Sequence, residues 1–441
     1  MRYPLHFLLW LLGPGLAIPT PAQTWLMPTP DLGTPKPQGP RIPTAGQLVD
    51  ERDARIRARN AASVEADLQQ VAARQAPRDA LLAEAQQDYA RIEQERREQA
   101  EFNAQFEASN KILYEAAYQA LAEMLDGRRR ANLPLAVFIV ENTYTNNQLS
   151  YAAFKARLDE LVQLCQGLAG AQANQAARFV ALQHLMADTV RVSDAGKAAV
   201  RHLPFQYDFV DFWGRQDHAR QFVTKLLRTG TGQCHSMPLL YKLLADQLGV
   251  PANLSMAPNH SYIQVVGPDG QLYSYETTNG HFTTDAFYMT SGYVKTAALK
   301  TRAYLDTLTL RQTLAYQLTD LAQGYAHYYG EDAFTEKCAT LALACYPQSV
   351  QAHLIRHNAA LTRFAVAYKA AGSPPKEQAM QRPALKPLWA EVARSNQALA
   401  AIGFEEIPPE QYARWLSSAQ TEQHRQESRQ AAAGFLKPTA K

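Results

Sequence analysis

The chain has 441 residues, of which 46% are hydrophobic and 19% charged, and its formal net charge is +3 at pH 7. This length and composition predict a folded protein with one large hydrophobic core or two to three ordinary ones. A charge so near zero, with basic residues interspersed among acidic ones, gives no electrostatic reason to expect a nucleic-acid partner.

The N-terminus has the order of features that is typical of a secretory signal peptide. Arg2 precedes an apolar run that reaches Ile18, and small residues follow at Thr20 and Ala22. We predict a signal peptide over residues 1–22 and a secreted or periplasmic protein. The alternative is a hydrophobic N-terminal helix on a cytoplasmic protein. No later stretch reaches about 18 consecutive apolar residues, so no membrane span is expected.

The next two segments differ in composition. Residues 23–46 are rich in proline, which predicts an extended leader. Residues 47–110 are dense in Ala, Gln, Glu and Arg with sparse apolar positions, which predicts solvated helices that are interrupted near Pro77. The apolar positions sustain no heptad over three or four repeats, so charged surface helices are favoured over a coiled coil.

Apolar residues then recur at helical spacing on both sides of the centre of the chain. Residues 111–300 are predicted to form one domain with a helical first part, and residues 301–441 a helical C-terminal region. One degenerate match to a tetratricopeptide repeat lies in the latter, and a stable array needs three or more repeats. The predicted local features are a helix end at Asp126-Gly127, a buried element over 135–140, a helix N-cap at Ser150 and a helix over 176–190.

The centre of the chain changes period. Residues 238–248 predict a helix that ends at Gly249. Three strands follow, and the last two are joined by a turn at Gly267-Pro268-Asp269-Gly270. The expected fold is therefore α+β, a mostly helical chain around a helix packed on a small antiparallel sheet. The predicted strands are residues 251–256, 261–266 and 271–276.

Cys234 lies at or just before the start of this helix, because Pro238 is tolerated only in the first helical turn. Unpaired backbone N–H groups at a helix start favour a thiolate, by about 0.3–1 kcal/mol. That is too little to activate a thiol of ordinary pKa near 8.5, whereas a paired imidazolium is sufficient. His260 opens the second strand, where it can face the sulfur. Glu276 ends the third strand beside it, and either Glu276 or Asn279 can orient the imidazole.

The stretch from Gly232 to Asn279 resembles the transglutaminase-like superfamily, a branch of the papain-like thiol fold. The similar features are Gly-Gln-Cys before an apolar helix, its Leu-Gly-Val-Pro-Ala exit, a histidine that opens a strand and Glu-Thr-Thr at the end of the next strand. The resemblance implies that Cys234 is the nucleophile, His260 its base and Glu276 the orienting acid. Glu276 stands where the family usually has aspartate, and Tyr262 where it often has tryptophan. The flanking helices also resemble those of exported bacterial-type proteins with this core.

The expected function is acyl transfer or hydrolysis at amide or peptide bonds, with a peptide or protein substrate. The Cys234 N–H would hold part of the oxyanion, and Gln233 is the adjacent side-chain candidate. Alternatives are an inactive peptide- or protein-binding module and a purely structural helical scaffold. No cofactor or metal is expected, because Cys234, His235, His260 and His281 match no closed zinc-ligand spacing. The oligomeric state is open.

Overall fold

The structure is a computed structural model that describes residues 107–171, 173–192, 200–211, 214, 216–267, 269–291, 294–406, 421 and 423–428, together with residues 58, 59 and 62. The predicted signal peptide and proline-rich leader lie outside these residues, as does nearly all of the charged region over 47–110. Residues 110–412 belong to one compact unit, which contains the candidate site. No described helix is long and apolar enough to cross a membrane.

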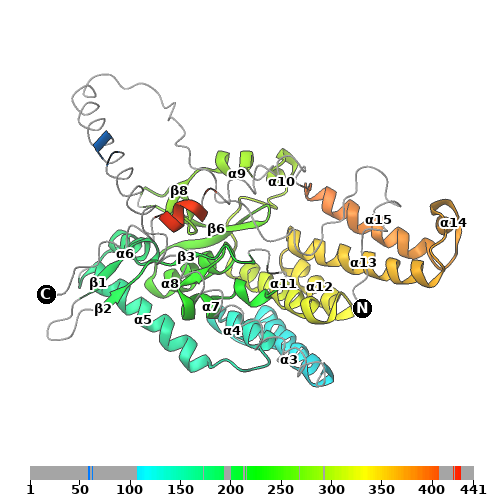
Figure 1. Cartoon of the computed structure of the whole chain (residues 1–441), viewed down its shortest axis with the longest axis horizontal. Helices are drawn as coiled ribbons and strands as arrows, with labels where there is room; N and C mark the ends of the chain where they lie inside the picture. Colours follow the sequence, from blue (N-terminus) through cyan, green and yellow to red (C-terminus); the bar gives the residue numbers. More distant parts are fainter. Residues whose placement is uncertain are drawn as a thin grey trace, which may run out of the picture. The chain divides into compact units, whose positions relative to one another are not determined.

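The compact unit is mostly helical and carries small sheets, which confirms the α+β class at this coarse level (Figure 1). The helices before the sheet are α3 (Glu107–Asp126), α4 (Leu133–Tyr144), α5 (Tyr151–Ala169), α6 (Gln175–Ala187), the 3-10 helix η3 (His218–Gln221) and α7 (Val223–Thr229). The predicted N-cap is confirmed, because the Ser150 hydroxyl accepts a hydrogen bond from the N–H of Ala153. The predicted end of a helix at Asp126 is also confirmed.

The helix predicted over residues 176–190 is too long by three residues at its C-terminal end. Asp188 has extended backbone angles, so α6 stops at Ala187. Val190 then begins β1 (Val190–Val192), which pairs antiparallel with β2 (Val200–His202). A helical pattern of apolar residues continued past the true boundary because Val190, the first residue of β1, is also apolar and buried.

The central helix and sheet match the sequence expectation closely. Helix α8 (Ser236–Leu248) ends at Gly249, which adopts the left-handed conformation that favours glycine. A four-stranded antiparallel sheet follows in the order β5 (Ala252–Ala257), β6 (His260–Val266), β7 (Leu272–Glu276) and β8 (His281–Thr283). Helix α8 packs against β5 and β6. The fourth strand, β8, was not predicted, since three residues are too short for a period-2 pattern.

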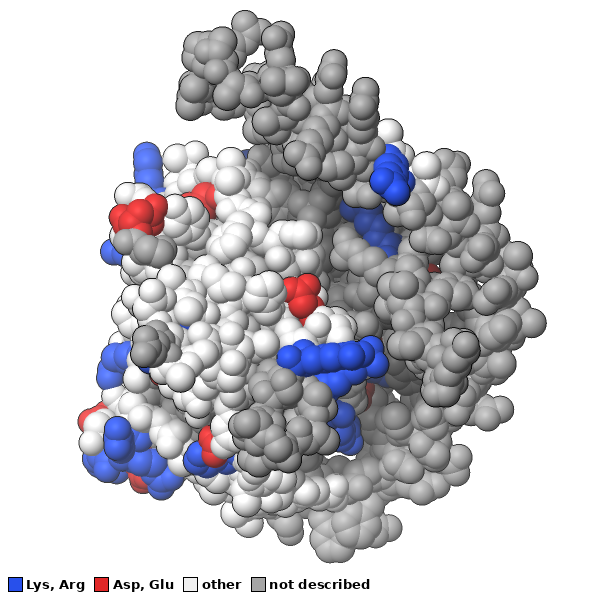
Figure 2. Space-filling model, turned by 90° about the vertical axis from the view of Figure 1, so that its left-hand side faces the viewer, with Lys and Arg blue, Asp and Glu red and all other residues white. Residues whose placement is uncertain are grey.

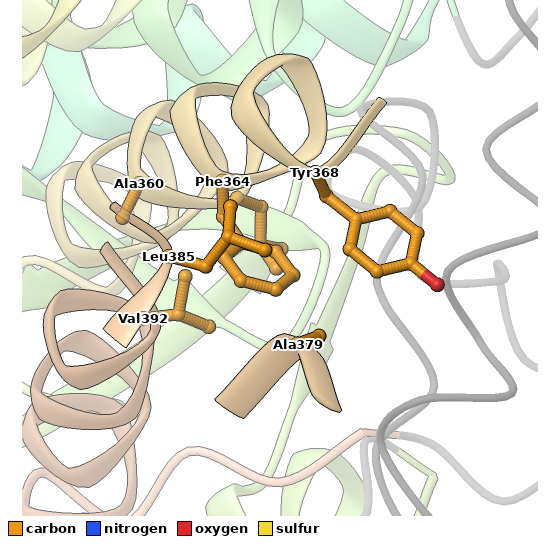
Figure 3. Packing of buried hydrophobic residues seen from close by; sticks show 7 residues of the cluster. Ala360, Phe364, Tyr368, Ala379, Leu385 and Val392 are labelled. Atoms are coloured by element: carbon orange, nitrogen blue, oxygen red, sulfur yellow. The ribbon is translucent and has the colours of Figure 1, made fainter. Parts of the chain in front are cut away.

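The remaining helices are α9 (Asp285–Ser291), α10 (Thr296–Lys300), α11 (Leu310–Tyr329), α12 (Ala333–Cys345), α13 (Val350–Ala370), α14 (Lys376–Gln381) and α15 (Lys386–Ala401). Helix α11 packs against both α4 and α12, and α13 packs against α12 and α15. Figure 3 shows how Phe364 of α13 faces Leu385 and Val392 in a buried hydrophobic cluster. Such burial supplies most of the stability of helices that are not held by disulfides, and all four cysteines are free.

Candidate active site

A tight turn between a short strand and a helix places Cys234. Strand β4 (Thr231–Gly232) pairs in parallel with β3 (Gln206–Tyr207), and α8 begins two residues after Cys234. The turn is closed by a hydrogen bond of 3.0 Å from the Gln233 N–H to the Ser236 hydroxyl. A Cβ atom at Gly232 would lie 2.8 Å from that hydroxyl, so the close approach requires glycine.

His260 and Glu276 meet across two adjacent strands. Ile263 of β6 pairs with Tyr275 of β7, so Glu276 lies on the same face as His260 and two residues short of the position opposite it. His260 Nε2 contacts Glu276 Oε2 directly, and both side chains are buried. The sequence prediction that these two residues are neighbours agrees with this geometry.

Further donors hold the Glu276 carboxylate in place. Its Oε2 accepts a hydrogen bond of 3.2 Å from the Tyr288 hydroxyl, and its Oε1 accepts bonds from the Thr278 N–H (3.1 Å) and hydroxyl (2.8 Å). Burial raises the pKa of Glu276, but the His260 imidazole and the Thr278 donors outweigh it and hold the pKa below its usual value. Glu276 is therefore an ionised acceptor at neutral pH.

The His260 imidazole interacts with the Cys234 thiol as well as with Glu276. The Ser261 hydroxyl donates a hydrogen bond of 2.6 Å to the Cys234 carbonyl, which fixes the start of β6 against the Cys234 turn. Burial lowers the pKa of His260, but the Glu276 carboxylate and the Cys234 thiol outweigh it and raise the pKa to about 10. Among the described residues, Nδ1 of His260 has no hydrogen-bond partner. Nδ1 is thus the ring nitrogen that Glu276 leaves available for proton transfer.

Polar groups enclose the sulfur. Cys234 is 2% exposed, and the Tyr207 hydroxyl is hydrogen-bonded to its thiol. Burial raises the pKa of Tyr207, and the nearby Cys234 raises it further, so the phenol stays protonated. A small apolar shell would leave a thiolate unsolvated, whereas the phenol and the imidazole can each stabilise it by hydrogen bonding.

The two supporting residues that the sequence suggested lie elsewhere. The Gln233 side chain donates from Nε2 to the carbonyl oxygens of Asp208 (3.4 Å) and Asp211 (3.5 Å), so in this conformation it braces a neighbouring loop. The Asn279 side-chain oxygen Oδ1 accepts the His281 N–H at 3.0 Å and stabilises the turn before β8. Of the two candidate orienting groups, the structure therefore brings Glu276 to the imidazole.

Sequence reasoning missed the groups that complete this arrangement. Tyr207 lies in an aromatic segment, and no spacing in the sequence connected it with Cys234. Tyr288 comes from α9 (Asp285–Ser291). Tyr262 stacks on Tyr288 with ring centroids 4.0 Å apart, beneath the Glu276 carboxylate. Before the structure, only the resemblance at Tyr262 had drawn attention to this aromatic layer.

The described residues contain no group of three or more His, Cys, Asp and Glu side chains that could hold a metal ion. On the face shown in Figure 2, charged side chains of both signs are scattered among uncharged ones. The candidate site consists of a thiol, an imidazole, a carboxylate and phenols. These groups can carry out nucleophilic and acid–base chemistry.

Comparisons with known proteins leave the chain without an assigned family. No protein-family model matches it, and no curated protein matches it significantly. A solved structure of menin, described with its binding site for the Mixed Lineage Leukemia protein, is 9% identical with a TM-score of 0.30. The match covers 70% of this chain and 88% of the menin chain. A likeness this weak carries no argument about fold or function.

Proposed function

We propose that the protein is an exported transglutaminase-like cysteine enzyme with a papain-like core, in which Cys234, His260 and Glu276 form the catalytic triad. The Cys234 thiolate attacks the carbonyl carbon of a carboxamide or peptide bond. The C–N bond breaks, His260 protonates the leaving amine, and a thioester remains on Cys234. Water then hydrolyses the thioester, or a second amine takes the acyl group.

The observation that carries this proposal is the contact between His260 Nε2 and Glu276, which leaves Nδ1 without a hydrogen-bond partner among the described residues. In a thiol–imidazole pair the base must keep one nitrogen for the nucleophile, and an acceptor on the other nitrogen fixes the ring. The raised pKa of His260 supports an imidazolium at neutral pH, which is the charge that stabilises a thiolate. The helix start after Cys234 adds a smaller favourable effect.

The alternative is a transglutaminase-like module that binds a peptide or protein without turnover. One observation favours it: Cys234 is 2% exposed and His260 4% exposed. A substrate carbonyl cannot reach the sulfur unless the groups around Tyr207 move. An enzyme needs that movement, and a binding module does not.

Turnover is tested with a dansylated amine and a glutamine-containing peptide, using the full chain without its first 22 residues. Incorporation of the amine indicates transfer, release of ammonia without incorporation indicates deamidation, and peptide cleavage indicates a protease. The Cys234→Ala variant should lose each signal. The matched control is Cys345→Ala, because Cys345 is a more exposed free thiol and its loss should change nothing.

Iodoacetamide labelling, resolved by residue with mass spectrometry, separates the enzyme from the module. An ion-paired Cys234 should react at a rate that stays high below pH 7. A rate that follows an ordinary thiol titration near pH 8.5, or that is negligible at every pH, would leave the binding module. Cys165 and Cys338 serve as internal references for inert thiols, since burial raises the pKa of Cys165 to about 12 and raises that of Cys338 as well.

A further inference from the structure

The residue that follows the candidate nucleophile is anchored on a helix of the C-terminal region. Both ring nitrogens of His235 contact α11: Nδ1 lies 3.1 Å from the Tyr316 hydroxyl, and Nε2 lies 3.3 Å from Asp320 Oδ2. Asp320 Oδ2 also accepts a hydrogen bond of 2.9 Å from Gln317 Nε2. An imidazole with partners on both nitrogens has a fixed ring orientation.

This contact is enclosed in a buried polar cluster. Burial lowers the pKa of His235, but Asp320 outweighs it, with a smaller contribution from Glu141, so the net pKa is raised. Glu141 of α4 accepts the N–H groups of Val223 (2.7 Å) and Thr224 (2.8 Å), and burial raises its pKa to about 7. A cavity of about 10 Å³, enough for one water molecule, lies among these groups. Its lining includes Glu141, His218, Gln221, His235, Gln317 and Asp320.

The Cys234 turn is tied down on two other sides. The Ser261 hydroxyl holds the Cys234 carbonyl from the sheet, and the Gln233 amide holds the loop at Asp208 and Asp211. The contacts of His235 with Tyr316 and Asp320 attach the turn to α11. A thiol and an imidazole that come from separate elements stay in register only if each element is fixed, and displacements near 1 Å are costly.

We propose that His235 is a positioning residue for Cys234, locked to α11 by Asp320 and Tyr316, so that α11 is part of the active centre. The proposal rests on the proposed function, because it explains how the Cys234–His260 pair is kept in register. It assigns to the C-terminal helices a role in chemistry rather than that of a spacer.

The test is the pH profile of iodoacetamide labelling at Cys234 between pH 5.5 and 9.5, in the full chain and in Asp320→Asn. The substitution keeps the shape of the side chain but removes the charge that holds His235. Loss of register should separate the thiol from His260, and a free thiol near pKa 8.5 is less than about 1% ionised at pH 6. We expect labelling at pH 6 to fall at least about tenfold, while labelling at pH 9.5 stays within about twofold, because an unpaired thiolate still forms there.

Asp332→Asn is the matched control. Asp332 is a partly buried carboxylate that caps the next helix and accepts the Tyr325 hydroxyl at 2.6 Å. Its loss should lower Tm and leave the profile at Cys234 unchanged, which separates positioning from general destabilisation. Tyr316→Phe removes only the Nδ1 partner of His235 and should show part of the fall in Cys234 labelling at pH 6. If Asp320→Asn does not fold, this variant tests the positioning role of His235.

An unchanged low-pH rate in the folded Asp320→Asn variant would overturn the positioning role while leaving the proposed enzyme intact. A full chain that itself shows no fast labelling below pH 7 would remove the thiol–imidazole pair, and the positioning role with it. The positioning role is therefore tested by the Asp320→Asn variant, and the thiol–imidazole pair by the unsubstituted chain, in the same experiment.

Discussion

Replacing Glu276 by glutamine tests the buried pair at the centre of the candidate site. The substitution preserves the shape of the side chain and removes its negative charge. His260 then loses one of the two partners, Glu276 and Cys234, that together raise its pKa from an ordinary 6.5 to about 10. Burial disfavours the imidazolium, and the Cys234 thiol alone supports it less than Glu276 and the thiol do together, so the neutral form of His260 should dominate in the variant at pH 7.

The size and the pH window of the effect follow from linkage. A group whose pKa rises on folding stabilises the folded state fully below its unfolded pKa and loses that effect as pH rises through its folded pKa. For His260 this amounts to about 5 kcal/mol at pH 5.5 and about 1 kcal/mol at pH 9.5. Glu276 has a lowered pKa, so its own contribution is present above its ordinary value of 4.5 and is lost in stronger acid. Loss of one member of a buried ion pair typically costs about 3–5 kcal/mol, in agreement with the value for His260 at pH 5.5.

Urea unfolding of the full chain and of Glu276→Gln at pH 5.5, 7.5 and 9.5 measures this difference. The matched control is Glu336→Gln, which breaks the half-exposed pair with Arg363 and should cost less than about 1 kcal/mol at each pH. A Glu276→Gln difference that is the same at pH 5.5 and 9.5, or that does not exceed the control, would refute the reasoning about a buried, charged His260.

Three further predictions concern the frame around the site. Lys225→Met removes the ammonium that contacts Asp208 at 2.5 Å, and it should lower the free energy of unfolding by about 3 kcal/mol. The control Lys155→Met removes an exposed ammonium and should cost less than about 1 kcal/mol. Both differences are measured by urea titration. Gly232→Ala forces the Cys234 turn apart and should cost about 1–3 kcal/mol and slow Cys234 labelling below pH 7; normal labelling would contradict the tight-turn argument. Phe364→Ala, at a fully buried position, should cost about 3–5 kcal/mol in the same titration with an unchanged labelling profile.

The central part of the fold could be predicted because its signals are local. Pro238 and Gly249 mark the two ends of one helix, and the tight turn at 267–270 fixes which strands are neighbours. Once β6 and β7 are paired, the face that carries His260 also carries Glu276. Local signals in the sequence were thus sufficient to predict three residues of the candidate site.

The rest of the site depends on contacts that span large separations in sequence. Tyr316 lies 81 residues from His235, and the Glu141 carboxylate meets α7 82 residues along the chain. Periodicity reports which face of a helix is buried, but not against which element. Buried polar residues such as Thr313, Gln317 and Asp320 on α11 break the apolar pattern, which is the signal that something other than packing occupies that face.

A glutamate, rather than a shorter aspartate, fits position 276 of this particular sheet. Glu276 lies two residues from the position opposite His260, so its carboxylate must reach along the strands as well as across them. The extra methylene supplies that reach, and the Thr278 and Tyr288 donors fix the longer side chain, which would otherwise sample more rotamers. The longer side chain of Glu276 is therefore held by its surroundings, through three hydrogen bonds from Thr278 and Tyr288.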